Sequence, residues 1–219
     1  MSSTEEIIRL VLADDHPTTR AGIRSLLSEA PDIQIVGEAQ DGLEAQQLTS
    51  QFRPHILLLD LQMPGLRPAE VERWVRTHCP ETITLVLTAH DRNAYLVDMI
   101  DAGVVGFLNK NEATASQLIN AIRRAVRGVI LFDAEQLERA RCWRETIGAK
   151  WHRLTDREHQ ILTLIVQGKT DREIASELNL KLKTVNNHVS KILDKLEVAS
   201  RTEAAVWVVK EGLIDGDTV

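Results

Sequence analysis

Short hydrophobic runs and helix-like segments alternate along the first half of the chain. The runs are rich in Val, Ile and Leu and lie at 7–12, 33–36, 56–59, 83–87 and 104–108. The helix-like segments lie at 17–30, 41–52, 68–77, 92–102 and 113–127. Because these strands lack a polar face, they require a parallel sheet covered by helices on both sides. The pattern predicts an α/β doubly wound (βα)5 domain over residues 1–128.

Proline and glycine mark the ends of several predicted helices. Pro17 and Pro68 suit the first helical turn, where no backbone donor is needed, and Gly103 and Gly128 suit C-terminal caps.

From residue 154 the apolar spacing becomes helical throughout, and strand signals disappear. Three capping boxes, each with a hydroxyl three residues before a glutamate, predict helix starts at Thr155–Glu158, Thr170–Glu173 and Ser200–Glu203. The four expected helices span 156–167, 171–178, 183–196 and 201–210, with Gly168 ending the first. We therefore predict an all-α four-helix domain over 153–219.

The segment between the two halves is not a Gly/Ser-rich linker. Over 134–146, Glu135 and Arg139 are one helical turn apart, and a partly apolar face ends before Gly148. These features predict a partly helical linker over 129–152.

Composition limits the possible classes of protein. The 219 residues are 43% hydrophobic, which suffices for two modest cores. The run at 7–12 is too short for a signal peptide or a membrane span, so we expect a cytoplasmic protein. Cys79 and Cys142 share no metal-ligand spacing with the histidines, which argues against a disulfide framework or a zinc site.

Charge is unevenly distributed along the chain. The net charge of −6 argues against nucleic acid as a partner, but residues 153–210 carry ten basic and eight acidic residues. Over 181–195 a single acidic residue, Asp194, accompanies four lysines: Lys181, Lys183, Lys191 and Lys195. This helix is either a nucleic-acid-binding surface or a solvated face.

Polar residues follow the predicted strands at their carboxyl ends, where doubly wound sheets bind ligands. They are Asp14 and Asp15 after the first strand, Asp60 after the third, Thr88 ending the fourth and Lys110 after the fifth. Clustered carboxylates are costly without a cation, and hard oxygen ligands suit Mg²⁺, which leaves room for phosphate oxygens. The sequence therefore predicts a magnesium site at this edge.

The motifs Asp14-Asp15, Asp60-Leu61-Gln62-Met63-Pro64-Gly65, Thr88-Ala89 and Phe107-Leu108-Asn109-Lys110 resemble the flavodoxin-like receiver domain of two-component signalling. The resemblance covers about residues 7–128. It implies that Asp60 accepts a phosphoryl group from a sensor histidine kinase, and that Asp14, Asp15, Asp60 and the backbone carbonyl of Gln62 hold Mg²⁺. It also implies that Lys110 stabilises the phosphoryl oxygens, and that Thr88 moves towards them and makes room for the ring of the switch residue Phe107.

Aspartyl-phosphate hydrolases also use an aspartate at a strand end. In that class an acid two residues further on protonates the leaving group, and Gln62 at this position cannot. We therefore expect no enzymatic activity beyond self-phosphorylation and autodephosphorylation. Gln62 and His90 are hypothesised to set the phosphoryl lifetime, although His90 could equally cap the next helix.

In the predicted helix over 183–196, one side is apolar and predicts core packing. Its residues are Val185, Val189, Ile192, Leu193 and Leu196. A short helix over 171–178, a tight connection and this second helix match a helix-turn-helix. The candidate base-reading residues are Asn186, Asn187 and Ser190. The candidate phosphate contacts are Lys183, Thr184, His188, Lys191 and Arg201. His188 could instead pack locally.

The strings Leu154-Thr155-Asp156-Arg157-Glu158, Ile174-Ala175, Thr184-Val185-Asn186-Asn187-His188-Val189, Lys195-Leu196 and Ser200-Arg201 resemble the LuxR-type module of NarL/FixJ regulators. Lys181 departs from the family, which usually has a capping Ser there. The resemblance implies double-stranded promoter DNA as a partner. It implies activation either through a homodimer of receiver domains or through release of a masked recognition helix. A phosphorylation-independent regulator is disfavoured by the intact Asp60, Thr88 and Lys110, and an RNA-binding antiterminator by the helical output domain.

Overall fold

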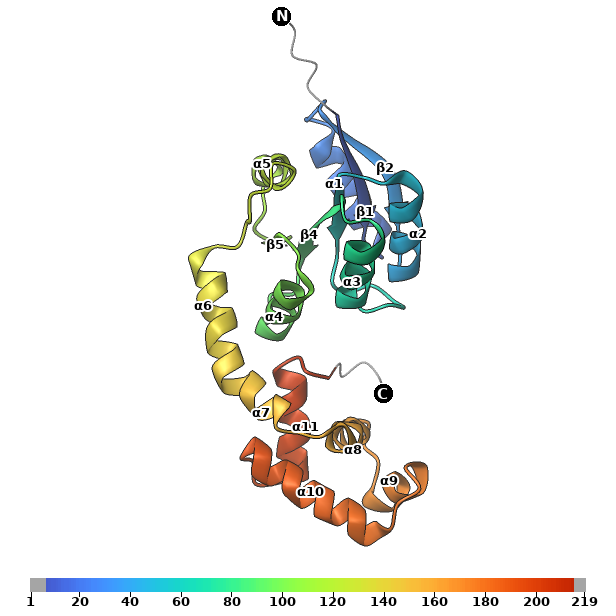
Figure 1. The fold of residues 1–219 in the computed structure, drawn as a ribbon, viewed down its shortest axis with the longest axis vertical. Helices are drawn as coiled ribbons and strands as arrows, with labels where there is room; N and C mark the ends of the chain where they lie inside the picture. The colour runs from blue at the N-terminus through green and yellow to red at the C-terminus, as the bar shows by residue number, and fades with distance from the viewer. Residues whose placement is uncertain (1–6, 215–219) are drawn as a thin grey trace, which may run out of the picture. The chain divides into compact units, whose positions relative to one another are not determined.

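The computed structural model describes residues 7–214, so the parts of the predicted domains at 1–6 and 215–219 lie outside the described residues. Its first unit contains one five-stranded parallel sheet in the order β2-β1-β3-β4-β5 (Figure 1). The strands are β1 (Ile8–Ala13), β2 (Ile33–Ala39), β3 (Ile56–Leu59), β4 (Ile83–Thr88) and β5 (Gly106–Asn109). The predicted doubly wound sheet is confirmed.

Five helices alternate with these strands. They are α1 (Pro17–Leu27), α2 (Gly42–Phe52), α3 (Pro68–His78), α4 (Asn93–Ala102) and α5 (Ala115–Ala125). One face of the sheet packs against α1 and α5, and its core includes Leu10, Leu58, Leu85, Ile23 and Ile122. Alternate strand residues point to the other face, which α2, α3 and α4 cover. Covering both faces explains why the strands read as unbroken apolar runs.

Local residue chemistry sets the ends of these helices. Pro17 and Pro68 occupy the first turn of their helices, as predicted. Gly103 and Gly128 have φ of +104° and +78°, a conformation that glycine adopts without the penalty of a Cβ. The first helix ends at Leu27, three residues earlier than predicted, where the Ser28 backbone N–H donates to the Arg24 carbonyl.

The second unit is entirely helical in the part of the chain that is described, and its main boundary with the first falls between residues 137 and 138. Its four predicted helices are confirmed as α8 (Asp156–Val166), α9 (Asp171–Glu177), α10 (Leu182–Leu196) and α11 (Arg201–Lys210). Their shared core includes Ile161, Ile174, Val185, Ile192 and Val208. Among residues 7–214, no helix is long and apolar enough to cross a membrane.

Two of the three predicted capping boxes are complete. Thr155 and Thr170 each exchange bonds with a glutamate in the third helical position. The third prediction is half wrong: Ser200 Oγ accepts from the Glu203 backbone, but the Glu203 carboxylate accepts from the backbone N–H of Ala199 rather than from that of Ser200. The carboxylate therefore reaches one residue further back than a capping box requires.

The predicted linker is more helical than its sequence suggested. It contains α6 (Ala134–Trp143), a π-helical turn η1 (Arg144–Gly148) and α7 (Ala149–His152) without a break. The predicted helical segment over 134–146 is confirmed, and the helical structure continues beyond it through Gly148. Gly148 has helical φ and ψ of −59° and −41°, and a Cβ there would lie 3.0 Å from the Trp143 ring. The glycine allows the tryptophan to approach the backbone and does not terminate the helix.

Candidate phosphorylation site and DNA interface

Asp14, Asp60 and Lys110 meet at the carboxyl edge of the sheet. The Lys110 ammonium lies 2.5 Å from Asp14 Oδ2 and 2.7 Å from Asp60 Oδ2. Both carboxylates are nearly inaccessible, with 1% and 5% of their side chains exposed. A single lysine thus bridges two buried carboxylates, an arrangement that strengthens the electrostatic interaction relative to water.

Strand register brings these residues together. Ala13 pairs with Leu59, so Asp14 and Asp60 each follow the last paired residue of neighbouring strands. The Asp60 backbone N–H donates to the Ala13 carbonyl at 2.9 Å. On the other side, the Lys110 N–H donates to the Thr88 carbonyl at 2.8 Å, which holds the base of the lysine beside β4.

Asp15 adds a third carboxylate to this edge. Ligand atoms of Asp14, Asp15 and His16 lie within 4.8 Å of one another, and His16 Nδ1 is 2.6 Å from Asp15 Oδ1. Three carboxylates and one ammonium leave a net negative charge, which a divalent cation would balance. The oxygen-rich donor set fits Mg²⁺. Sequence reasoning did not include His16, which is 66% exposed.

The other predicted receiver residues have different environments. Thr88 is fully buried, and its Oγ1 accepts from the His90 backbone N–H at 3.2 Å. The Phe107 side chain is also buried, with 2% exposure, so the ring already occupies an interior position. The Gln62 side chain is exposed. The roles assigned to these residues stay predictions.

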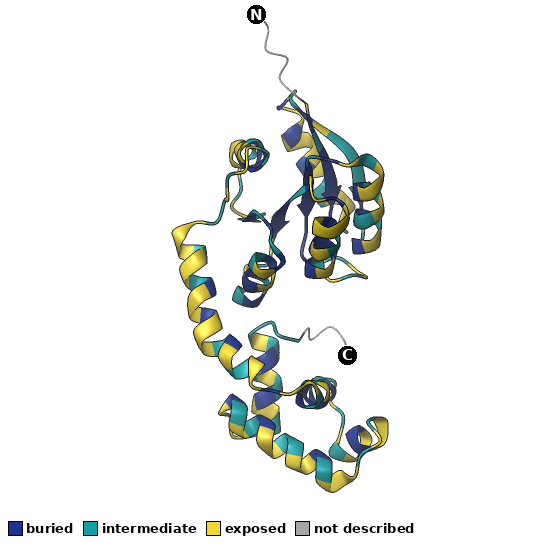
Figure 2. Ribbon diagram, in the orientation of Figure 1, coloured by how far each residue is buried: buried dark blue, intermediate teal, exposed yellow. Residues whose placement is uncertain are grey.

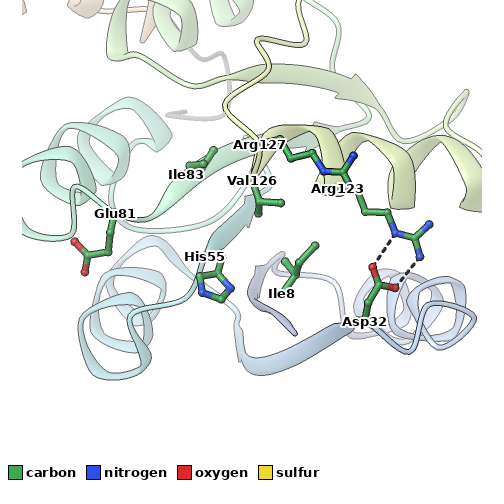
Figure 3. Close-up of a pocket in the computed structure, with 8 residues that line it drawn as sticks. All are labelled: Ile8, Asp32, His55, Glu81, Ile83, Arg123, Val126 and Arg127. Carbon is green, nitrogen blue, oxygen red and sulfur yellow. Dashed lines mark hydrogen bonds and ion pairs between the residues drawn. The ribbon is translucent and has the colours of Figure 1, made fainter. Parts of the chain in front are cut away.

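A separate cavity of about 650 Å³ is lined by residues at the amino ends of the strands (Figure 3). The carboxylate cluster follows the carboxyl ends of the strands, at the other edge of the sheet. Arg123 forms a bidentate pair with Asp32 on one wall, with Nε and Nη2 contacts of 2.8 and 2.6 Å. This pair holds the pKa of Asp32 below its ordinary value, mainly through the Arg123 hydrogen bond. The pair joins α5 to the start of β2 and takes no part in the carboxylate site.

In the second unit, α10 presents different chemistry on its two sides. Val185, Ile192 and Leu196 are buried in the core, as the apolar stripe predicted. The candidates for DNA contact lie largely outside it: Lys183, Asn186, Asn187, Ser190 and Lys191 are exposed, and Thr184 and His188 are partly buried. Figure 2 shows this division along the helix. His188 Nδ1 is buried, and no hydrogen-bond partner is found for it within the described part of the chain.

Two DNA-contact candidates also make contacts inside the unit. Arg201 Nη1 lies 2.6 Å from Asp171 Oδ1, and its Nη2 donates to the Lys169 carbonyl at 2.6 Å. With its amide oriented to satisfy both ends, Asn186 donates to Asp171 Oδ2 at 3.0 Å. Asp171 therefore joins α9 to α10 and α11. Sequence spacing gave no signal for this network because its members lie far apart in the chain.

Lys195 also has a structural role. Its ammonium lies 2.6 Å from Glu158 Oε2, and the Glu158 carboxyl is 2% exposed. Burial raises the pKa of Glu158, but hydrogen bonds from Lys195 and from the Thr155 cap outweigh it and leave the pKa below its ordinary value. Lys195 thus ties the end of α10 to the start of α8, and the lysines that remain exposed on α10 are Lys183 and Lys191.

A receiver-like sheet with a carboxylate–lysine cluster, followed by a helix-turn-helix unit, defines a regulator with separate signal-input and DNA-binding parts. Family models agree with this division. Residues 10–123 match the response regulator receiver domain, and residues 152–208 match the bacterial regulatory proteins of the luxR family.

Known proteins match nearly the whole chain or its receiver domain alone. The response regulator protein VraR of Staphylococcus aureus is 35% identical over 207 residues, covering 94% of this chain and 99% of VraR. A solved receiver domain of the putative response regulator NarL from Mycobacterium tuberculosis is 36% identical, with a TM-score of 0.54, and covers 56% of this chain and 98% of that domain. The RcsB response regulator, solved in complex with DNA, is 25% identical, with a TM-score of 0.61, covering 94% of this chain and 99% of that one. The chain belongs to the NarL-type response regulators, with a receiver domain and a LuxR-type DNA-binding domain.

Proposed function

We propose that Asp60 accepts a phosphoryl group from a sensor histidine kinase in the cytoplasm and that this modification controls binding of α10 to promoter DNA. The observation that carries the proposal is the position of the Lys110 ammonium, within 2.7 Å of two buried carboxylates. This arrangement supplies a nucleophilic oxygen and a cation for the oxygens of an arriving phosphoryl group.

In the transfer, a bond forms between an Asp60 oxygen and phosphorus while the bond from phosphorus to the kinase histidine breaks. Asp60 Oδ1 accepts from the Leu61 backbone N–H at 2.7 Å, which fixes the plane of the carboxylate. Lys110 then exchanges part of its contact with Asp60 Oδ2 for the phosphoryl oxygens. Mg²⁺ held by Asp14, Asp15, Asp60 and the Gln62 backbone carbonyl would supply further charge neutralisation when bound.

The response to phosphorylation begins at Thr88 in this proposal. Its hydroxyl leaves the His90 N–H and donates to the phosphoryl group, which moves the chain after β4. The neighbouring strand β5 carries Phe107, whose ring is packed inside the domain, so movement at β4 changes its surroundings. The rearranged receiver surface would then favour a homodimer that places two α10 helices on half-sites about one DNA turn apart.

The proposal is tested by incubating the full chain with Mg²⁺ and a small acyl phosphate donor, mapping the modified residue by mass spectrometry, and measuring promoter-fragment binding at one stated salt concentration. We expect one phosphoryl group on Asp60 and tighter binding to DNA. DNA binding that is unchanged by stoichiometric phosphorylation would contradict the proposed control.

Replacing Lys191 with alanine is expected to weaken binding to all DNA sequences by a similar factor. Lys191 is exposed and has no ion-pair partner among residues 7–214, so it is available to a phosphate. Losing one phosphate contact should lower the slope of log affinity against log salt by about 1. The measurement is a salt titration, and Lys210→Ala serves as a comparison because that lysine is exposed on α11 and not on α10. A sequence-dependent loss at an unchanged salt slope would show that Lys191 reads a base instead.

A further inference from the structure

The first turn of α6 is bonded to the strand that carries Phe107. Gln136 Nε2 donates to the Phe107 carbonyl at 3.0 Å, across 29 positions of sequence. The same amide caps the helix: its Oε1 accepts from the Asp133 N–H at 3.2 Å, and Asp133 Oδ1 accepts from the Gln136 N–H at 2.7 Å. One side chain therefore fixes both the start of α6 and its contact with β5.

The segment just before α6 follows the outer edge of β5. This strand is last in the sheet order, and the Leu131 N–H donates to the Val105 carbonyl at 2.7 Å. Gly106 permits this approach, because a Cβ there would lie 2.7 Å from Leu131 Cβ. The chain thus leaves the receiver sheet alongside the strand that contains Phe107.

At its other end, the helical segment is fixed to the DNA-binding unit. Lys150 Nζ lies 2.8 Å from Glu197 Oε2, and the rings of Trp151 and His159 lie 4.1 Å apart. Glu197 is the C-cap residue that directly follows α10. The segment 134–152 is therefore bonded near its start to β5 and near its end to the C-cap of α10, the helix that we propose binds DNA.

We propose that Gln136 is a positioning residue that transmits the state of the Phe107 strand to the linker helix. This inference rests on the proposed function, because it needs phosphorylation to alter β5. The Phe107 ring is buried, and the Phe107 backbone carbonyl is hydrogen-bonded to the linker through Gln136. A displacement of that carbonyl strains or breaks a bond made by the group that also caps α6, so the strand and the helix start change together.

The test is Gln136→Glu in the full-length chain. Glutamate keeps an oxygen for the Asp133 N–H but removes the donor and places a negative charge against the Phe107 carbonyl. We expect Asp60 to be phosphorylated at the wild-type rate. The ratio of DNA dissociation constants before and after phosphorylation should fall about three- to tenfold, as expected for one hydrogen bond.

A second variant and a matched control separate coupling from helix capping. Gln136→Lys keeps a donor for the Phe107 carbonyl but lacks the capping oxygen, so it should retain more of the phosphorylation response than Gln136→Glu. Gln117 makes the same type of cap in α5, where its Oε1 accepts from the Thr114 N–H at 2.8 Å. Gln117→Glu should leave the response unchanged.

The outcomes distinguish this inference from the proposed function. A wild-type protein whose DNA affinity does not respond to phosphorylation overturns both. A wild-type response that is fully retained in Gln136→Glu overturns the inference alone, as does an equal loss of response in Gln117→Glu.

Discussion

The Asp60→Asn variant is expected to take up no phosphoryl group from a small acyl phosphate donor, whereas the wild-type chain is labelled stoichiometrically. An amide oxygen is a far weaker nucleophile than a carboxylate, and it brings no negative charge to balance Lys110. The change is nearly isosteric, and Lys110 keeps its 2.5 Å contact with Asp14, so the fold should be retained. Labelling is followed by intact-protein mass spectrometry, with circular dichroism to confirm folding.

Asp32→Asn is the matched control for this loss. Asp32 pairs with Arg123 beside the cavity at the opposite edge of the sheet, away from the carboxylate cluster. We expect it to be labelled as fully as the wild-type chain. Labelling that persists in Asp60→Asn would assign the nucleophile to another residue, and the proposed mechanism would then fail.

Glu72→Gln is expected to stabilise the receiver domain by up to about 3 kcal/mol at pH 8. Glu72 lies on α3 with 2% exposure, and no hydrogen-bond partner is found for its Oε2 in the described chain. Burial raises the pKa of this carboxyl from 4.5 to about 7, and Thr84 and Arg76 oppose the shift only in part. A rise of this size corresponds to about 3 kcal/mol of unfavourable free energy for the ionised form.

The sign of the pH dependence follows from the raised pKa. Below pH 4.5 the Glu72 carboxyl is protonated in both folded and unfolded chains, so it imposes no penalty. As the pH rises towards 7 the unfolded chain loses this proton first, so stability falls until the folded carboxyl also ionises. Glutamine mimics the protonated carboxyl, so its advantage should shrink to below about 1 kcal/mol at pH 5.

Hydrogen exchange of the β4 backbone amides, measured at pH 5 and pH 8 and corrected for intrinsic rates, reports the free energy of opening of this domain. Glu29→Gln, an exposed carboxyl on the same unit, should change it by less than about 0.5 kcal/mol. A Glu72→Gln advantage that is equal at both pH values would show that packing, and not ionisation, is responsible.

Several structural features could be predicted because the sequence records them locally. Unbroken apolar strands indicated a sheet covered on both faces, and polar residues just after the strands located the carboxylate cluster. Thr155 and Thr170 marked helix starts because each bonds to a glutamate only three residues further along the chain. Gly148 could not be interpreted in this way. Its role is to leave space for the ring of Trp143, and this packing is visible only in the folded structure.

By itself the sequence determined the class of both domains and the Asp14, Asp60 and Lys110 set, since periodicity and strand-end chemistry depend on near neighbours. Only the tertiary structure decided that Glu72 lies in the core, that Asp171 joins Arg201 to α9, and that Gln136 reaches Phe107. Each of these features depends on residues that are distant in the sequence and come together only when the chain folds. A surface glutamate and a buried one have the same sequence signal, so packing alone distinguishes them.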